Sequence, residues 1–186
     1  GFFNVREAWR QYEPVGFIEE RAEITLPSKV EIANSYSSEV VSLIDRELFT
    51  QVEKLLADIK RSNNPVRSRN RLGVLYARFG LLDKAVEQFN LVLDEEDDYA
   101  PALINMGNIY FMKDDIDTAL SFYDRAEEQA PNNARLVLAV ARSHHELENY
   151  GSSRKAYDTL KSLDAKLAEQ YSYLELRGDE AQRASE

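Results

Sequence analysis

The feature that most constrains this chain is an internal repeat with a period of 34 residues. Three consecutive segments, 66–99, 100–133 and 134–167, align in this register without gaps. Small and aromatic residues recur at the aligned positions, which are Gly73, Gly107 and Ala141; Tyr76, Tyr110 and His144; Ala85, Ala119 and Ser153; and Phe89, Tyr123 and Tyr157. A period of this length predicts stacked structural units, each of which buries an apolar face against its neighbours.

The middle segment carries the fullest pattern, with Met106-Gly107, Tyr110, Ala119, Tyr123 and Pro131. This pattern resembles the tetratricopeptide repeat, a helix-turn-helix unit. The resemblance covers the three segments and implies an all-α fold, a right-handed superhelix of paired helices. The third segment departs from the pattern at Ala141, His144, Ser153 and Ala165, so we expect the loosest packing there.

Gly107 lies inside an otherwise strong helical pattern, although glycine disfavours a helix interior by roughly 1 kcal/mol. We expect the missing side chain, together with Ala119, to let two helices approach closely, so that packing offsets this cost. The turn inside each repeat is expected at Gly80, at Asp114-Asp115 and at Asn149.

Three segments flank the repeats. The sequence predicts a packing helix with an apolar stripe at residues 37–63. It predicts a C-terminal capping helix with a frayed tail at residues 168–186. Residues 1–36 predict a short helix and extended chain, and resemble the connection between a transglutaminase-like domain and a tetratricopeptide region in some bacterial proteins. That resemblance implies part of a larger bacterial protein. The stripe consists of Val41, Ile44, Leu48, Leu55 and Ile59.

Charge and cysteine content exclude several classes of function. The 23 basic and 33 acidic residues give a net charge of −10, which argues against binding to nucleic acid or anionic lipid. Without cysteine the chain has no thiolate metal ligand or cysteine nucleophile, and its composition fits the bacterial periplasm, cell envelope or cytoplasm equally.

The first helices of the repeats are expected to line a concave groove that binds a peptide. Its residues combine arginines and asparagines with apolar side chains, which suits a peptide with acidic and apolar residues. Alternatively, Phe111, Met112 and Leu138 pack against a neighbouring helix or are covered by the N-terminal segment. The groove residues are Arg67, Asn70, Val74, Arg78, Ile104, Asn105, Asn108, Phe111, Met112, Arg135, Leu138, Arg142 and His145.

Tetratricopeptide domains that clamp a chaperone C-terminus carry lysines and asparagines at set positions. The corresponding residues here are Asn70, Val74, Asn105, Arg135 and Ala139, of which only Asn105 matches, so the resemblance does not extend to that subclass.

No motif for catalysis or for a cofactor is present. His144-His145 invites a metal interpretation, but adjacent helical residues point about 100° apart. We therefore expect a non-enzymatic adaptor without cofactor or metal, whose partner is another protein. The alternatives are self-association through Trp9, Tyr171 and Tyr173, and a regulatory tail of a larger enzyme.

Overall fold

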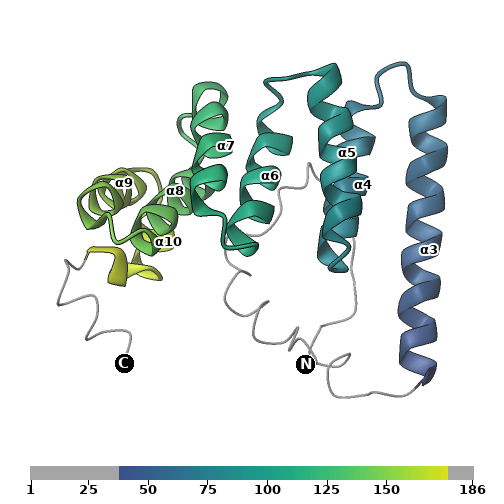
Figure 1. Cartoon of the computed structure of the whole chain (residues 1–186), viewed down its shortest axis with the longest axis horizontal. Helices are drawn as coiled ribbons and strands as arrows, with labels where there is room; N and C mark the ends of the chain where they lie inside the picture. Colours follow the sequence, from purple (N-terminus) through teal and green to yellow (C-terminus); the bar gives the residue numbers. More distant parts are fainter. Residues whose placement is uncertain (1–37, 176–186) are drawn as a thin grey trace. The chain divides into compact units, whose positions relative to one another are not determined.

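The computed structural model describes residues 38–175, with side chains from residue 46 onward, and all regular structure in this part is helical (Figure 1). The predicted all-α fold is confirmed, whereas the interpretation of residues 1–36 lies outside the described residues. The helices are α3 (Ser38–Arg61), α4 (Val66–Arg78), α5 (Leu82–Glu95), α6 (Ala100–Met112), α7 (Ile116–Gln129), α8 (Ala134–Glu146), α9 (Tyr150–Leu163) and α10 (Ala165–Glu169), followed by the 3₁₀ turn η1 (Ser172–Glu175).

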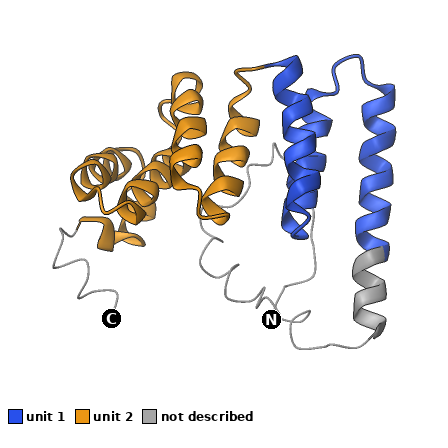
Figure 2. Cartoon of the chain, viewed as in Figure 1, with its two compact units in different colours: residues 1–14, 18–96 blue, residues 15–17, 97–186 orange. Residues whose placement is uncertain are grey.

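The described chain divides into two compact units after Glu96 (Figure 2). The first unit contains α3, α4 and α5, and the second contains α6 through η1. The pairs α4–α5, α6–α7 and α8–α9 each form a helical hairpin, and each hairpin lies within one of the three segments that the 34-residue register defines.

The turns inside the hairpins share one backbone feature. Gly80, Asp114 and Glu148 have positive φ angles of 74°, 64° and 56°, and they are spaced by the same 34 residues. Glycine adopts this left-handed conformation without steric cost, whereas a residue with a Cβ atom is strained there. The repeat therefore extends to backbone geometry at a position where the residue type is not kept.

Side-chain caps begin several of the helices. A carboxylate or amide oxygen accepts a hydrogen bond from a backbone N–H of the first turn, which is otherwise unpaired. Asp115 caps α7, Asn133 caps α8, Asn149 caps α9 and Asp164 caps α10. In the first unit, the Asn64 Oδ1 atom accepts from the Val66 N–H at 3.1 Å, at the start of α4.

In the first unit, α3 packs on α4 through a small apolar core. Leu55 of α3 is buried with Leu72 and Leu75 of α4, and Leu48 and Ile59 of the predicted stripe pack against this core. The side chains of Val41 and Ile44 lie outside the described residues. Because apolar residues recur every three to four positions along α3, one face of this helix meets α4.

The structure gives Gly107 a specific packing role. A Cβ atom built on this residue would lie 2.3 Å from the Tyr123 ring, far inside van der Waals contact. In the first unit, a Cβ atom on Gly73 would lie 2.6 Å from the Phe89 ring. At both glycines a helix backbone therefore lies directly against the aromatic ring of its hairpin partner.

The C-terminal region differs from the single capping helix that we predicted. Because the Asp164 carboxylate accepts the Leu167 N–H at 2.9 Å, a short helix begins earlier, inside the third repeat segment. This helix, α10, ends at Glu169, and η1 then turns the chain so that Tyr171 and Leu174 are buried. Both α10 and η1 contact α9.

Candidate functional site

The predicted groove residues occupy three kinds of environment in the structure. Arg67 and Arg135 are exposed, and Arg78, Met112 and His145 are half-buried. The other eight are buried, which differs from the open surface that the register predicts. They are Asn70, Val74, Ile104, Asn105, Asn108, Phe111, Leu138 and Arg142.

The second unit shows why so many of these side chains are buried. Helix α6 packs against both α7 and α8, so it is enclosed from more than one side. Every residue from Ala102 to Ile109 is buried, and Phe111 follows with only 8% of its surface exposed. The expectation from the repeat register that Ile104, Phe111 and Leu138, and also Val74 of the first unit, are exposed is therefore wrong. The burial of Phe111 and Leu138 agrees with the alternative that they pack against a neighbouring helix. Their part in binding a peptide stays a prediction.

Arg142 connects aromatic side chains from two parts of the second unit. Its guanidinium carbon lies 5.2 Å from the centre of the Phe111 ring, within the range of a cation–π interaction. The same guanidinium donates a hydrogen bond to the hydroxyl group of Tyr173 in η1. Arg142 itself is 6% exposed, so a charge on α8 is held between an aromatic ring of α6 and the C-terminal turn.

His145 lies one helical turn beyond Arg142 and between two tyrosine rings. Its ring is nearly perpendicular to the rings of Tyr150 and Tyr173, with centroid distances of 5.3 Å and 5.2 Å. Burial lowers the pKa of the His145 imidazole, and the nearby Glu146 carboxylate partly opposes this shift. The Nε2 atom is buried and has no hydrogen-bond partner within residues 46–175. We call Phe111, Arg142, His145 and Tyr173 the Arg142 cluster.

Burial raises the pKa values of the tyrosines around this cluster. For Tyr171 and Tyr173 the positive charge of Arg142 opposes the increase, because it favours the phenolate form. The pKa of Tyr123 is also raised by burial. These phenols therefore act as neutral hydrogen-bonding groups at physiological pH.

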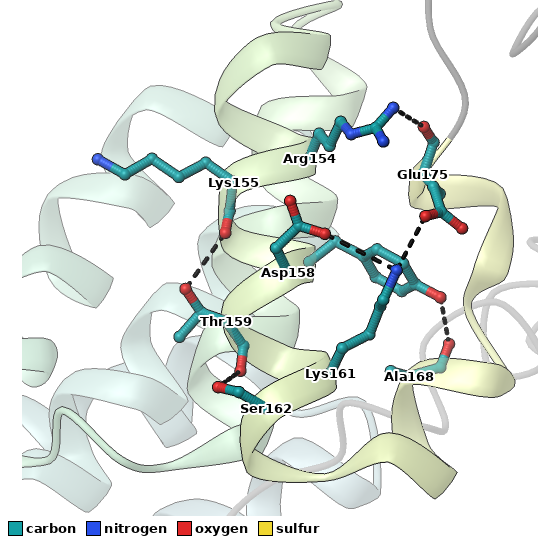
Figure 3. A network of polar contacts seen from close by, with 9 residues as sticks. Arg154, Lys155, Asp158, Thr159, Lys161, Ser162, Ala168 and Glu175 are labelled. Atoms are coloured by element: carbon teal, nitrogen blue, oxygen red, sulfur yellow. Dashed lines mark hydrogen bonds and ion pairs between the residues drawn. The ribbon is translucent and has the colours of Figure 1, made fainter.

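A second polar network fixes the C-terminal turn to α9 (Figure 3). The Lys161 ammonium lies 2.8 Å from the Glu175 carboxylate, and Arg154 donates to the Glu175 backbone carbonyl at 3.4 Å. The Tyr157 hydroxyl donates to the carbonyl of Ala168 at 3.0 Å. Lys161 and Glu175 are both partly exposed, so solvent screens their charges. The ion pair therefore orients the turn more than it stabilises it.

The other chemical signals in the sequence do not lie together in one site of the described residues. Within residues 46–175, histidine and acidic side chains form no group of three that could hold a metal ion. Among the described helices, none combines the length and the apolar character that crossing a membrane requires. His144 occupies the tyrosine position of its repeat and is half-buried. The structure thus gives His144-His145 surroundings of packed side chains.

Sequence reasoning missed the link between the C-terminal turn and α8. Arg142 and His145 were predicted as groove residues, and Tyr171 and Tyr173 as exposed aromatics for self-association. Tyr171 is instead 7% exposed, whereas Tyr173 keeps 38% exposure. No signal in the sequence pairs Tyr173 with Arg142, because their contact depends on how η1 turns. Trp9 lies outside the described residues.

Comparison with known proteins agrees with the repeat register. A family model described as a tetratricopeptide repeat matches residues 100–133, the segment that carries the fullest pattern. The chain is also 29% identical over 93 residues to a protein named "Protein CTR9 homolog" from Arabidopsis thaliana. That match spans 50% of this chain and 8% of the length of the plant protein, so it concerns a small part of that relative.

Solved structures share the fold. A crystal structure of MamA superposes with a TM-score of 0.58 at 18% sequence identity, covering 80% of this chain and 91% of the other. A second MamA structure gives a TM-score of 0.58 at 19% identity, covering 75% and 80% of the two chains. At this identity the likeness is one of fold. Residues 100–133 are therefore a tetratricopeptide repeat within an all-α chain of the same fold type.

Proposed function

We propose that this chain is a non-enzymatic interaction module that binds a peptide segment of another protein through residues of its first helices, α4, α6 and α8. The observation that supports the proposal best is the matched tetratricopeptide repeat at residues 100–133, set within three helical hairpins. Stacked helical repeats create extended surfaces that other proteins can bind. Scaffolding between proteins is the general role that follows.

The proposed ligand is a peptide with acidic and apolar side chains. Arg67 and Arg135 stand at the same position of the first and third repeats, at the start of α4 and α8, and both are exposed. They are positive groups in a chain of net charge −10. An arginine guanidinium binds a carboxylate through two parallel hydrogen bonds, which gives affinity and orientation together.

A peptide-selection experiment tests this function. A library of displayed peptides is selected on the full chain, and the affinity of the enriched peptides is measured by fluorescence anisotropy. We expect enrichment of acidic-apolar sequences and a loss of affinity of about 10-fold for each of Arg67→Glu and Arg135→Glu, since each change replaces an attraction by a repulsion.

Lys155→Glu is the matched control, because it reverses an exposed positive charge on the second helix α9. Circular dichroism establishes that all three variants stay folded. Equal affinity of the Lys155→Glu, Arg67→Glu and Arg135→Glu variants for the selected peptides would contradict a binding face on the first helices.

Self-association is the second candidate function. Among the aromatic residues that suggested it, Tyr173 retains 38% exposure. Light scattering across a concentration series distinguishes the two candidate functions. A constant monomer mass at all concentrations argues against self-association, whereas the proposal of peptide binding is compatible with a monomer.

A further inference from the structure

The side chain of Tyr173, a residue of η1, packs against α8. Its hydroxyl oxygen accepts a hydrogen bond from Arg142, and its ring contacts His145 edge-on with centroids 5.2 Å apart. The Arg142 guanidinium that binds the Tyr173 phenol also lies over the Phe111 ring. Its central carbon is 5.2 Å from the centre of that ring. Arg142 and His145 of α8 thus contact the side chain of Tyr173, and Phe111 of α6 contacts Arg142 in turn.

The turn that carries Tyr173 is anchored by other residues. Leu174 is fully buried and Tyr171 is 7% exposed, whereas Tyr173 is 38% exposed. Glu175 holds the turn to α9 through Lys161 and through Arg154. Removing the Tyr173 side chain would therefore leave the turn attached while uncovering the atoms of Arg142 and His145 that face it.

The side chains below Tyr173 offer chemistry suited to a phenol. A guanidinium binds both the face of an aromatic ring and a hydroxyl oxygen. The buried Nε2 atom of His145 has no hydrogen-bond partner in the described side chains, so the cluster holds polar capacity that the present arrangement leaves unused. An arginine between aromatic rings is also a common anchor of protein interfaces.

We propose that Phe111, Arg142 and His145 form a receptor for a tyrosine side chain, that Tyr173 fills it as an internal ligand, and that the partner peptide delivers its own tyrosine there. This inference rests on the proposed function, because it names the ligand for the part of the proposed binding surface that α8 contributes. It explains how largely buried groove residues take part in binding, since the partner exchanges with a side chain of the same kind.

The internal ligand weakens binding of an external one. A side chain tethered next to its receptor competes at a high effective concentration, in the millimolar range for a short connection. A tyrosine-containing peptide must therefore bind more tightly once Tyr173 is removed. A phenylalanine-containing peptide fills the same space but lacks the hydroxyl acceptor for Arg142, so it binds more weakly.

The test uses a capped synthetic peptide with the sequence of residues 170–175, QYSYLE, as the probe. Its binding to the full wild-type chain and to the Tyr173→Ala variant is measured by NMR titration, following the side-chain signals of Arg142 and His145. We expect the variant to bind at least about 10-fold more tightly than wild type, with shifts at both residues. The same peptide with its second tyrosine replaced by alanine should cause no such shifts.

Ser172→Ala is the matched control, because it alters an exposed residue of the same turn. It should bind the probe as weakly as the wild type does. If Tyr173→Ala reduces the helical signal, Tyr173→Phe replaces it, and a smaller increase in affinity is expected. Equal affinity of the folded variant and the wild type, or equal binding of the alanine-substituted peptide, would overturn the receptor.

This failure is distinguishable from failure of the proposed function. If library-selected peptides bind and respond to Arg67→Glu and Arg135→Glu, but the probe does not discriminate Tyr173→Ala from wild type, the interaction module stands and the tyrosine receptor falls.

Discussion

The second and third repeats place the same aromatic residue in two different ways. In the second repeat the Tyr123 hydroxyl donates to the side chain of Asn108 at 2.8 Å, within one hairpin. In the third repeat Tyr157 donates to the carbonyl of Ala168, in the capping helix α10. Both tyrosines are buried, so both hydroxyl groups need a partner.

The difference follows from one substitution between the repeats. The residue that corresponds to Asn108 in the 34-residue register is Arg142. Arginine carries only donors, so it cannot accept the proton that Tyr157 donates. The tyrosine of the third repeat is therefore bonded to the cap, while Arg142 contacts Phe111 and Tyr173 instead. One change of residue type ties the last repeat to the C-terminal turn.

The two repeats also differ at the glycine position, where Gly107 corresponds to Ala141. We expected looser packing in the third repeat for this reason. Ala141 and Ser153 are nevertheless fully buried and Tyr157 is 3% exposed, much as their counterparts are in the second repeat. Burial at these positions therefore does not separate the two repeats. What separates them is the partner of each tyrosine.

The largest expected effect concerns Gly107. Gly107→Ala would place a Cβ atom 2.3 Å from the Tyr123 ring, so the ring must move, and we expect a loss of stability of roughly 1–3 kcal/mol. Gly107→Leu should prevent folding, with loss of binding only as a consequence. Urea denaturation followed by circular dichroism measures the change.

Gly151→Ala is the control for this prediction. Gly151 lies in α9, and a Cβ atom added there would point into open space, so alanine should stabilise the chain by about 0.5–1 kcal/mol through helix propensity. Similar stability changes in the two variants would mean that the ring contact does not explain the glycine.

The next effect separates the two tyrosines directly. Tyr123→Phe and Tyr157→Phe should each cost about 1 kcal/mol, because each removes one buried hydrogen bond. Hydrogen exchange should distinguish them, since only Tyr157→Phe releases the carbonyl of Ala168 and speeds exchange in α10. Equal exchange rates of the α10 amides in both variants would show that Tyr157 does not hold the cap.

The smallest effect compares the hairpin turns. Glu148 has a φ angle of 56°, and Glu148→Gly should relieve strain of roughly 1–2 kcal/mol, partly offset by the entropy that glycine loses on folding. A net gain of about 0.5 kcal/mol is expected in thermal denaturation. Asp114→Gly should gain less, because aspartate visits this conformation more readily. A loss of stability in Glu148→Gly would show that its side chain makes a compensating contact.

The repeat register predicted the helices because each repeat contains its own signals. Gly80 lies in the first turn, Asp115 caps α7 and Asn149 caps α9, all within or next to the turns we expected. Such signals act over a few residues, so sequence is enough to read them. The groove was harder to predict. The repeat register predicts in which direction a side chain points, but not which other residues cover that side chain.

The sequence by itself determined the repeating helical hairpins, the small residues that recur in the repeat register, and the charge pattern that argues for a protein ligand. Only the tertiary structure decided that Phe111 and Arg142 are buried, that Tyr173 lies against His145, and that Tyr157 is bonded to α10. The physical reason is range. Helix propensity, caps and turns act between near neighbours, whereas the cluster depends on how η1 turns back onto α8, which contacts distant in the chain decide together.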